Sequence, residues 1–217
     1  MSELVMFEQT STPLTPSGGK VAGFFDNTSI SRFKYVDDAG GIVIVGPVPT
    51  STSVTTVSAS YASDTYLEGS GIVVNAGAWK AQTQYRCIFD MVKTAAGTAA
   101  FTVQIRLGTD GTTSDASVCS LAFAVGTAAV DTGRFEVVAT FRTVGSGTSA
   151  VVQGWISCDH HLASTGLTTT GGAGSGIINT TGAGFASTTQ THIGISVNGG
   201  TSFSGTNTQV QAELFGI

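Results

Sequence analysis

The chain has 217 residues, enough for one well-formed hydrophobic core and a small extra module. Charged residues make up only 11% of it, under half the roughly 25% typical of soluble domains, and 29 residues are glycine. This composition favours short strands joined by tight turns over helices, and the net charge of −5 without a Lys/Arg-rich run argues against nucleic acid as a partner.

The first residues predict an extended arm. Residues 1–19 are polar and contain Pro13 and Pro16, which disfavour a helix. This segment also lacks the apolar run of about 7–15 residues that marks a signal peptide, and the longest apolar runs, such as Ile42–Val45, are too short to cross a membrane. We therefore expect a protein made in a reducing cytoplasm, without export and without a membrane partner.

A small β module is predicted over residues 20–46. Strand signals occur in KVAGFFD and in SRFKYVDDAGGIVIV, and the second reads as a hairpin that turns at Asp37-Asp38-Ala39-Gly40. Residues 47–70, which include Pro47 and Pro49, predict a linker that merges into a first strand.

Residues 71–217 predict a single antiparallel head domain. Apolar and polar residues alternate in segments separated by turn signals, which is the pattern of a β-sandwich or jelly roll with about eight strands. The segments are 79–91, 101–107, 119–125, 135–141, 151–157, 193–197 and 210–214. The expected fold is therefore all-β, with a small N-terminal β-hairpin module followed by an antiparallel jelly roll.

The last third of the chain is almost free of charge. After Arg142 there is no Lys or Arg, and the only acidic residues are Asp159 and Glu213. Charge is depleted where subunits bury their surfaces, so this stretch predicts burial between subunits. The alternative is a surface solvated by Ser, Thr and Asn alone.

The segment WISCDHHLAS holds the best candidate for a reactive site, because Cys158, Asp159, His160 and His161 are adjacent. Side chains alternate between the two faces of a strand, so one chain offers at most two neighbouring ligands, whereas a structural zinc site normally needs four. We interpret the segment as a strand end and the following loop. The minority alternative is a three-histidine metal site formed by His160 or His161 of three chains around a symmetry axis.

No other segment supplies catalytic chemistry or a cofactor site. Asp37, Asp38, Asp110 and Asp115 read as turn residues, no GxSxG elbow occurs, and the glycine-rich stretch 168–184 matches no phosphate-binding loop. We read the three cysteines, Cys87, Cys119 and Cys158, as buried reduced thiols. The sequence therefore predicts a protein that is not an enzyme and has no cofactor.

The two tryptophans have different expected places. Trp79 is in phase with an apolar face, which predicts a core position. Trp155 shares a face with Gln153 and Ser157, which leaves an interface or a partly exposed position open.

The stretch TPLTPSGGKVAGFFDNTSISRFKYVDDAGGIVIVG resembles a short module at the start of tailed-bacteriophage fibre and head-surface proteins. The matching residues are Pro13, Pro16, Gly19, Lys20, Val21, Phe25, Lys34, Asp38, Gly40 and Ile42–Val45. The remainder resembles the compact jelly-roll heads of such proteins, which commonly form trimers, and the closing TQVQAELFGI is similar to their last strand.

The resemblance implies a homotrimeric virion structural protein. Residues 1–46 would anchor it to the capsid or to other virion proteins, through Pro13, Pro16, Lys20, Phe25, Lys34 and Tyr35. The short segment between module and head favours a head fibre or capsid decoration protein over a long tail fibre.

Three alternatives remain open at this point. The first is a receptor-binding tail fibre tip that recognises host surface saccharides through the outer loops, including residues 164–189. The second is a depolymerase on a β scaffold, which needs a pair of acids that the sequence does not show. The third is a cellular, cytokine-like trimeric jelly roll, which the N-terminal resemblance and the missing export signal disfavour.

Overall fold

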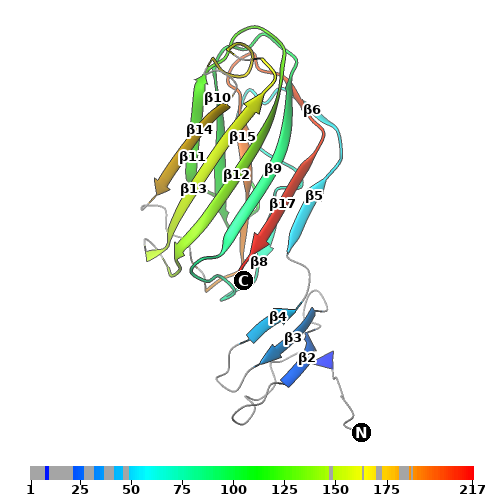
Figure 1. The fold of residues 1–217 in the computed structure, drawn as a ribbon, viewed down its shortest axis with the longest axis vertical. Coiled ribbons are helices and arrows are strands. Elements are labelled where there is room, and N and C mark those ends of the chain that lie inside the picture. The colour runs from blue at the N-terminus through cyan, green and yellow to red at the C-terminus, as the bar shows by residue number, and fades with distance from the viewer. Residues whose placement is uncertain are drawn as a thin grey trace. The chain divides into compact units, whose positions relative to one another are not determined.

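The protein is built from β-strands, as its composition predicts (Figure 1). The computed structural model describes residues 8–9, 22–26, 32–36, 42–45, 49–146, 149–162, 164–169, 173–180, 186 and 188–217. No α-helix occurs among these residues. Nothing helical in the described part of the chain has the length and apolarity needed to cross a membrane. The chain divides into two compact units, Met1–Val48 and Pro49–Ile217.

The smaller unit contains one sheet. Strand β1 (Glu8–Gln9) pairs in parallel with β2 (Ala22–Asp26), and β2 continues antiparallel to β3 (Arg32–Val36) and β4 (Ile42–Val45). Its pattern of apolar and aromatic residues at short intervals suits strands. The turn predicted at Asp37 to Gly40 lies outside the described residues.

The larger unit contains two antiparallel sheets of unequal size. Its strands are β5 (Thr50–Ser53), β6 (Val57–Ala59), β7 (Thr65–Tyr66), β8 (Ile72–Val74), β9 (Gln84–Lys93), β10 (Ala100–Gly108), β11 (Ala116–Val125), β12 (Asp131–Thr143), β13 (Val151–His160), β14 (Ala173–Thr180), β15 (Thr191–Asn198), β16 (Gly205–Asn207) and β17 (Val210–Phe215). The eight-stranded sheet runs β14-β13-β12-β9-β16-β6, with β17 pairing β9 and β5. The five-stranded sheet runs β11-β10-β15-β7, and β8 also pairs β15.

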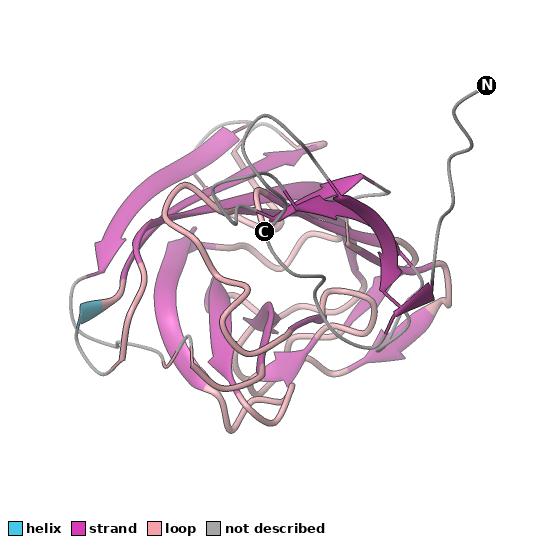
Figure 2. Cartoon of the chain, turned by 90° about the horizontal axis from the view of Figure 1, so that it is seen from below, coloured by secondary structure: helices cyan, strands magenta, loops and turns pink. Residues whose placement is uncertain are grey.

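The pairing within this unit is nested. The outermost pair is β5 with β17, and inside it lie β8 with β15, β9 with β12, and β10 with β11. Two strands, β13 and β14, do not belong to this nest and extend the larger sheet beyond β12. Seen from below, the strands curve around a common interior (Figure 2).

Inward-facing residues of both sheets form one hydrophobic core. The alternation predicted for β10 and β12 is confirmed, because Phe101, Val103, Ile105 and Leu107 of β10 are buried, as is every second residue of β12 from Phe135 to Phe141. Trp79 is also in the core, where its indole N–H donates to Thr191 Oγ1 at 2.6 Å.

Two predicted strands differ from the structure. The strand expected over 79–91 begins only at Gln84, because Gln82 takes a left-handed turn conformation (φ 73°) and interrupts the alternation. In β11 one register shift lets Val118 and Cys119 both face the core, and a second, between Ala122 and Val125, leaves Val125, expected inside, exposed. Each shift displaces only the residues beside it, and Cys119 and Phe123 are buried as predicted.

Residues 50–70, expected as a linker and first strand, are integral to the larger unit. They supply β5, β6 and β7, and these strands pair with β17, β16 and β15 respectively. No separate shaft therefore lies within this stretch.

Part of the charge depletion after Arg142 is explained within one chain. Strand β15 is central in its sheet, and six of its eight residues are buried, on both faces of the strand. Charged residues are excluded from such a strand for the same reason that they are excluded from a subunit interface. Burial between subunits is then needed to explain the lack of charge only in the residues after Arg142 that lie outside β15.

Candidate functional site

The CDHH segment is a strand end, as the sequence predicts. Cys158, Asp159 and His160 close β13, and His161 follows in a bend. Cys158 and His160 are buried and Asp159 and His161 are exposed, so the segment divides between the two faces as a strand requires. Among the described residues, no group of three or more His, Cys, Asp or Glu side chains is placed to hold a metal ion.

His160 belongs to a buried pair that the sequence did not reveal. Its Nδ1 atom lies 2.7 Å from Oδ2 of Asp131, the first residue of β12, and both side chains are completely shielded from solvent. Asp131 also accepts backbone N–H bonds from Thr132 (2.8 Å), Leu162 (3.2 Å) and Leu167 (3.0 Å). Burial alone raises the pKa of the Asp131 carboxyl, but these hydrogen bonds outweigh it and hold the pKa below its usual value.

Lys93 completes a buried ionisable cluster, which we define as Lys93, Asp131 and His160. Lys93 is only 1% exposed, and its ammonium donates to the backbone carbonyls of Thr127 and Gly166, the second at 3.2 Å. Burial lowers the pKa of Lys93, and the negative charge of Asp131 partly restores it. The cluster therefore ties the ends of three strands to the segments around Thr127 and around residues 162–167.

This cluster is built to hold a loop and offers little for catalysis. The ionised Asp131 carboxylate accepts four hydrogen bonds, so it fixes the proton of His160 on Nδ1. His160 Nε2 is buried and has no hydrogen-bond partner among the described residues. An active base needs its free nitrogen near a proton that it can take, and no nucleophilic hydroxyl of the described residues bonds to it.

The three cysteines are buried and unpaired, which confirms the prediction of free thiols. Burial raises the pKa of Cys87 to about 12 and that of Cys119 to about 11. Burial, with the negative charges of Asp131 and Asp159, raises the pKa of Cys158 to about 12. Since the thiolate is the nucleophilic form, none of the three is a reactive cysteine at neutral pH.

A signal for the buried cluster does exist in the sequence. Lys93 is in phase with the inward residues of β9, Asp131 with those of β12 and His160 with those of β13. Three ionisable residues that continue three apolar faces at neighbouring strand ends predict a shared buried site. The strand pairing needed to see this is long-range, and sequence reasoning therefore missed it.

The remaining sequence candidates are structural or lie outside the described residues. Asp115 accepts the backbone N–H groups of Asp110 (2.9 Å) and Gly111 (2.8 Å), so it shapes a turn as expected. Asp37 and Asp38 lie outside the described residues. Of the residues expected to anchor the protein, Pro13, Pro16 and Lys20 also lie outside; Phe25 is in β2 and Lys34 and Tyr35 are in β3, and the structure describes only their backbone.

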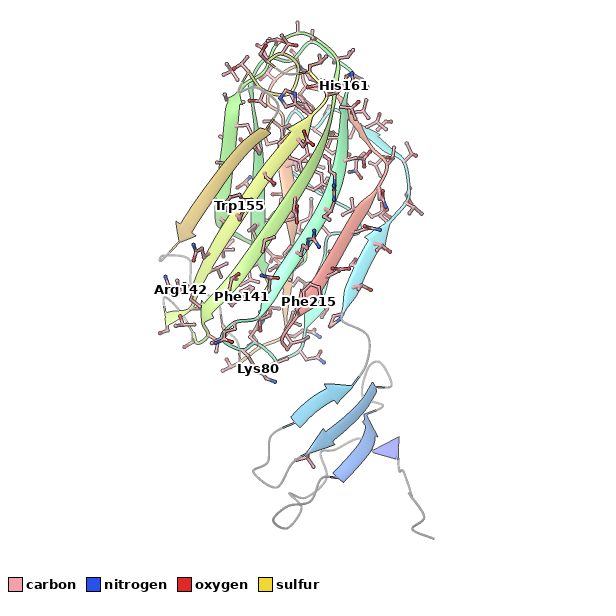
Figure 3. The ribbon with its side chains drawn as sticks, in the orientation of Figure 1. Lys80, Phe141, Arg142, Trp155, His161 and Phe215 are labelled. Carbon is pink, nitrogen blue, oxygen red and sulfur yellow. The ribbon has the colours of Figure 1, made fainter. Side chains whose placement is uncertain are left out.

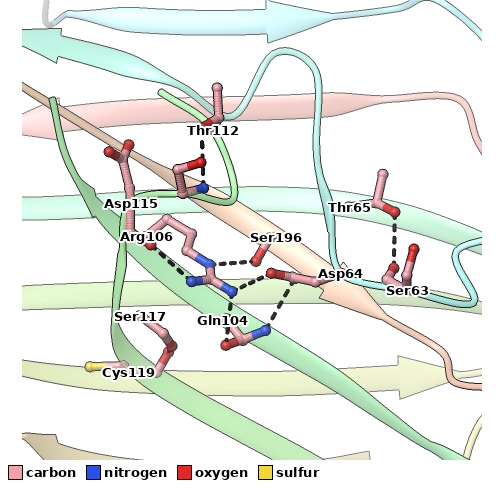
Figure 4. Close-up of polar contacts among 11 residues, drawn as sticks. Ser63, Asp64, Thr65, Gln104, Arg106, Thr112, Asp115, Ser117, Cys119 and Ser196 are labelled. Atoms are coloured by element: carbon pink, nitrogen blue, oxygen red, sulfur yellow. Dashed lines mark hydrogen bonds and ion pairs between the residues drawn. The ribbon is translucent and has the colours of Figure 1, made fainter. Parts of the chain in front are cut away.

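The outer face of the five-stranded sheet is closed by a polar network (Figure 4). Arg106 binds Asp64, and it also donates to Ser196 Oγ (2.9 Å) and to the carbonyl of Asp115 (2.9 Å). Gln104 Nε2 donates to the other carboxylate oxygen of Asp64 at 3.1 Å. These groups therefore satisfy one another.

The outer face of the eight-stranded sheet is different, because it presents an exposed tryptophan. Trp155 of β13 is 44% exposed in the single chain, so it lies outside the core. Figure 3 shows it midway along β13, far from His161 at the end of the strand. Beside it lie Val138 of β12 and then Arg86 of β9, while Ile177 is its backbone partner on β14.

The polar side chains around this tryptophan bond to no other described residue. Gln153 and Ser157 precede and follow it by two residues on the same face, and Thr140 is the partner of Gln153 on β12. The charged groups nearby are paired with each other, since Arg86 lies 2.7 Å from Glu136. We call Trp155, Val138, Gln153, Thr140 and Ser157 the Trp155 face.

Comparison with known proteins gives no family assignment. No protein-family model matches the chain, and no curated protein matches its sequence. Its function must therefore be argued from its own residues.

Proposed function

We propose that the protein is a non-enzymatic structural protein of a tailed-phage virion, a capsid-surface decoration protein or short head fibre. The observation that carries this proposal is that Lys93 and Asp131 of the buried ionisable cluster bond to backbone groups of neighbouring loops. A reaction centre needs groups poised towards a substrate, whereas Asp131 and Lys93 are saturated by the protein itself. In this proposal the protein acts through its surfaces and through its assembly with other chains.

The larger unit is, in this proposal, a jelly roll. A jelly roll arises when a long antiparallel hairpin is wrapped into two sheets, so that the first strand pairs with the last and the inner strands follow in order. The nested pairs β5–β17, β8–β15, β9–β12 and β10–β11 support this assignment. The added strands β13 and β14 depart from the simplest eight-stranded form. The architecture is shared by many functions, so it supports but does not decide a virion role.

The smaller unit, in this proposal, attaches the protein to the particle. Its resemblance to the N-terminal modules of phage surface proteins supports the role, as does its separation from the larger unit as a compact body of its own. We propose a homotrimer, because three anchors on one assembly multiply a weak single-chain affinity. The capsid or another virion protein would be the partner of residues 1–46.

The direct test is the composition of purified particles. Particles of the phage whose genome carries this sequence should contain its peptides by mass spectrometry at a fixed ratio to the major capsid protein. Light scattering of chains 1–217 and 49–217 should give three times the monomer mass for both. Absence from the particles would contradict the virion role, and a monomeric mass would contradict the trimer.

A receptor-binding tip that recognises host saccharides is the second candidate. The observation that favours it is the exposed Trp155, which has polar neighbours on the same face of the sheet. The outer loops over residues 164–189 were the site expected from the sequence, and much of that stretch lies outside the described residues.

A further inference from the structure

The Trp155 face breaks the usual pattern of an outward sheet surface. Along β13 the inward residues Val152, Ile156 and Cys158 are buried in the core, so outward positions are expected to be polar. At the middle of that outward row stands the largest apolar side chain, nearly half exposed. A tryptophan that contributes little to the core and remains in water is characteristic of a binding surface.

We propose that the Trp155 face binds a neutral saccharide chain, with the indole of Trp155 as its stacking platform. The apolar side of a pyranose ring presents C–H groups, which pack against the electron-rich face of an aromatic ring. This inference goes beyond a structural role and holds whether or not the protein is part of a virion.

The polar groups around the indole match the hydroxyls of a stacked sugar. Gln153 and Ser157 flank Trp155 at roughly 6–7 Å along the strand, and Thr140, the partner of Gln153 on β12, is a diagonal neighbour of Trp155 at roughly 7–8 Å. The side chains of these three residues make no hydrogen bond to any other described residue. Amide and hydroxyl groups that can both donate and accept suit vicinal sugar hydroxyls, which do the same.

The charge pattern indicates that the ligand is neutral. Arg86 and Glu136, the nearest charged groups, bind each other through two contacts, at 2.7 Å and 2.9 Å. A charged ligand would have to break this pair to find a partner. A neutral, hydroxylated ligand leaves it intact.

The same features disfavour a second copy of the chain as the occupant. The centres of protein–protein interfaces are depleted in serine and carry few unpaired polar groups, because each one loses its water on association. Here the tryptophan is bracketed by three such groups. A sugar replaces the lost water bonds with its own hydroxyls, whereas a flat protein surface does not.

The test uses the full chain and a panel of neutral polysaccharides. Dextran, cellohexaose, mannan, galactan and chitohexaose cover the common neutral sugars, and polygalacturonate is the charged comparison. Binding is measured by calorimetry and by quenching of tryptophan fluorescence. We expect at least one neutral probe to bind, with affinity unchanged by added salt.

The variants separate stacking from folding. Trp155→Ala should weaken binding by about tenfold or more, and Trp155→Phe should retain part of it, because a smaller ring still stacks. Gln153→Ala should weaken binding by a smaller factor. The matched control is Phe215→Ala, which removes the other exposed aromatic side chain of this sheet and should leave binding unchanged. Urea unfolding of each variant shows that the fold is intact.

Three results would overturn the proposal. They are no binding of any neutral probe at millimolar concentration, equal binding by Trp155→Ala, and a change in the mass of the protein caused by that substitution. The last would identify the face as a self-association surface. None of these results bears on whether the protein occurs in purified particles, so the virion role is judged separately.

Discussion

Two regions of the eight-stranded sheet reverse the ordinary arrangement of side chains, and they do so in opposite senses. At the strand ends, Lys93, Asp131 and His160 turn ionisable groups inwards. On the outer face, Trp155 turns a large apolar group outwards. Lys93 and Asp131 are saturated by hydrogen bonds to two loops, whereas the polar side chains around Trp155 bond to no other described residue.

The two regions therefore have different roles, one in stability and the other in contact with another molecule. A buried charge is tolerated only when its partners are fixed, so the buried ionisable cluster belongs to the stability of the fold. A partly exposed indole on an outer sheet face is available for contact with another molecule.

The largest effect is expected for Asp131→Ala. It leaves Lys93 buried without a counter-charge and three backbone N–H groups without an acceptor, so the free energy of unfolding should fall by about 3–5 kcal/mol. Urea unfolding measures the change. The control is Asp159→Ala, which removes an exposed carboxylate from β13, two strands away from Lys93 on β9. It should change the free energy of unfolding by no more than about 0.5 kcal/mol. Equal effects of the two substitutions would contradict the role of the cluster.

Two arginines test whether the loss of stability on removing a charged side chain depends on how far that side chain is shielded from solvent. The Arg106 side chain is 12% exposed and has several partners, while that of Arg86 is 41% exposed and pairs with Glu136 alone. Arg106→Ala should lower the free energy of unfolding by about 1.5–3 kcal/mol, whereas Arg86→Ala should cost about 0–1 kcal/mol. Thermal or urea unfolding distinguishes them, and a reversed order would show that surface pairing dominates.

The dependence of stability on pH should have two limbs with different origins. The pKa of Asp131 is lower in the folded protein, so its contribution is present above about pH 4 and is lost as the pH falls through its folded value. Asp131→Asn should flatten this acid limb.

The alkaline limb comes from the raised pKa values of Cys87, Cys119 and Cys158. Their contribution is complete below the ordinary thiol pKa of about 8.5 and is lost as the pH rises towards about 11–12. The lowered pKa of Lys93 has the opposite effect. Burial in the folded state favours the neutral amine, so this group adds stability as the pH rises. Urea midpoints measured from pH 3 to pH 10 test both limbs, and an alkaline limb unchanged in Cys158→Ala would exclude that thiol as a cause.

A smaller loss of stability than that of Asp131→Ala is expected for Trp155→Ser. The side chain is 44% exposed and lies outside the core, so the free energy of unfolding should fall by about 1–2 kcal/mol. Urea unfolding provides the measurement. A loss close to that of Asp131→Ala would place Trp155 among the residues that hold the fold together.

Much of the fold follows from local alternation. The faces of β10 and β12 and the buried cysteines could be predicted, because every second residue of a half-buried strand must be apolar. Where the period is broken, at Gln82 and at the register shifts of β11, the prediction fails only locally, at Ala81, Val118 and Val125. The sites were harder, since Lys93 and Asp131 are 38 residues apart in number and meet His160 only through strand pairing.

Three properties could be predicted from the sequence alone. The fold is all-β, the CDHH segment ends a strand, and Cys158 and His160 share a face of that strand. These properties depend on the two-residue period of a strand, which any short segment displays. Only the tertiary structure decided that β5 pairs with β17, that residues 50–70 belong to the larger unit, and that Asp131 meets His160. Those contacts join residues far apart in the chain, and their stability comes from burial of both partners together, which no single segment encodes.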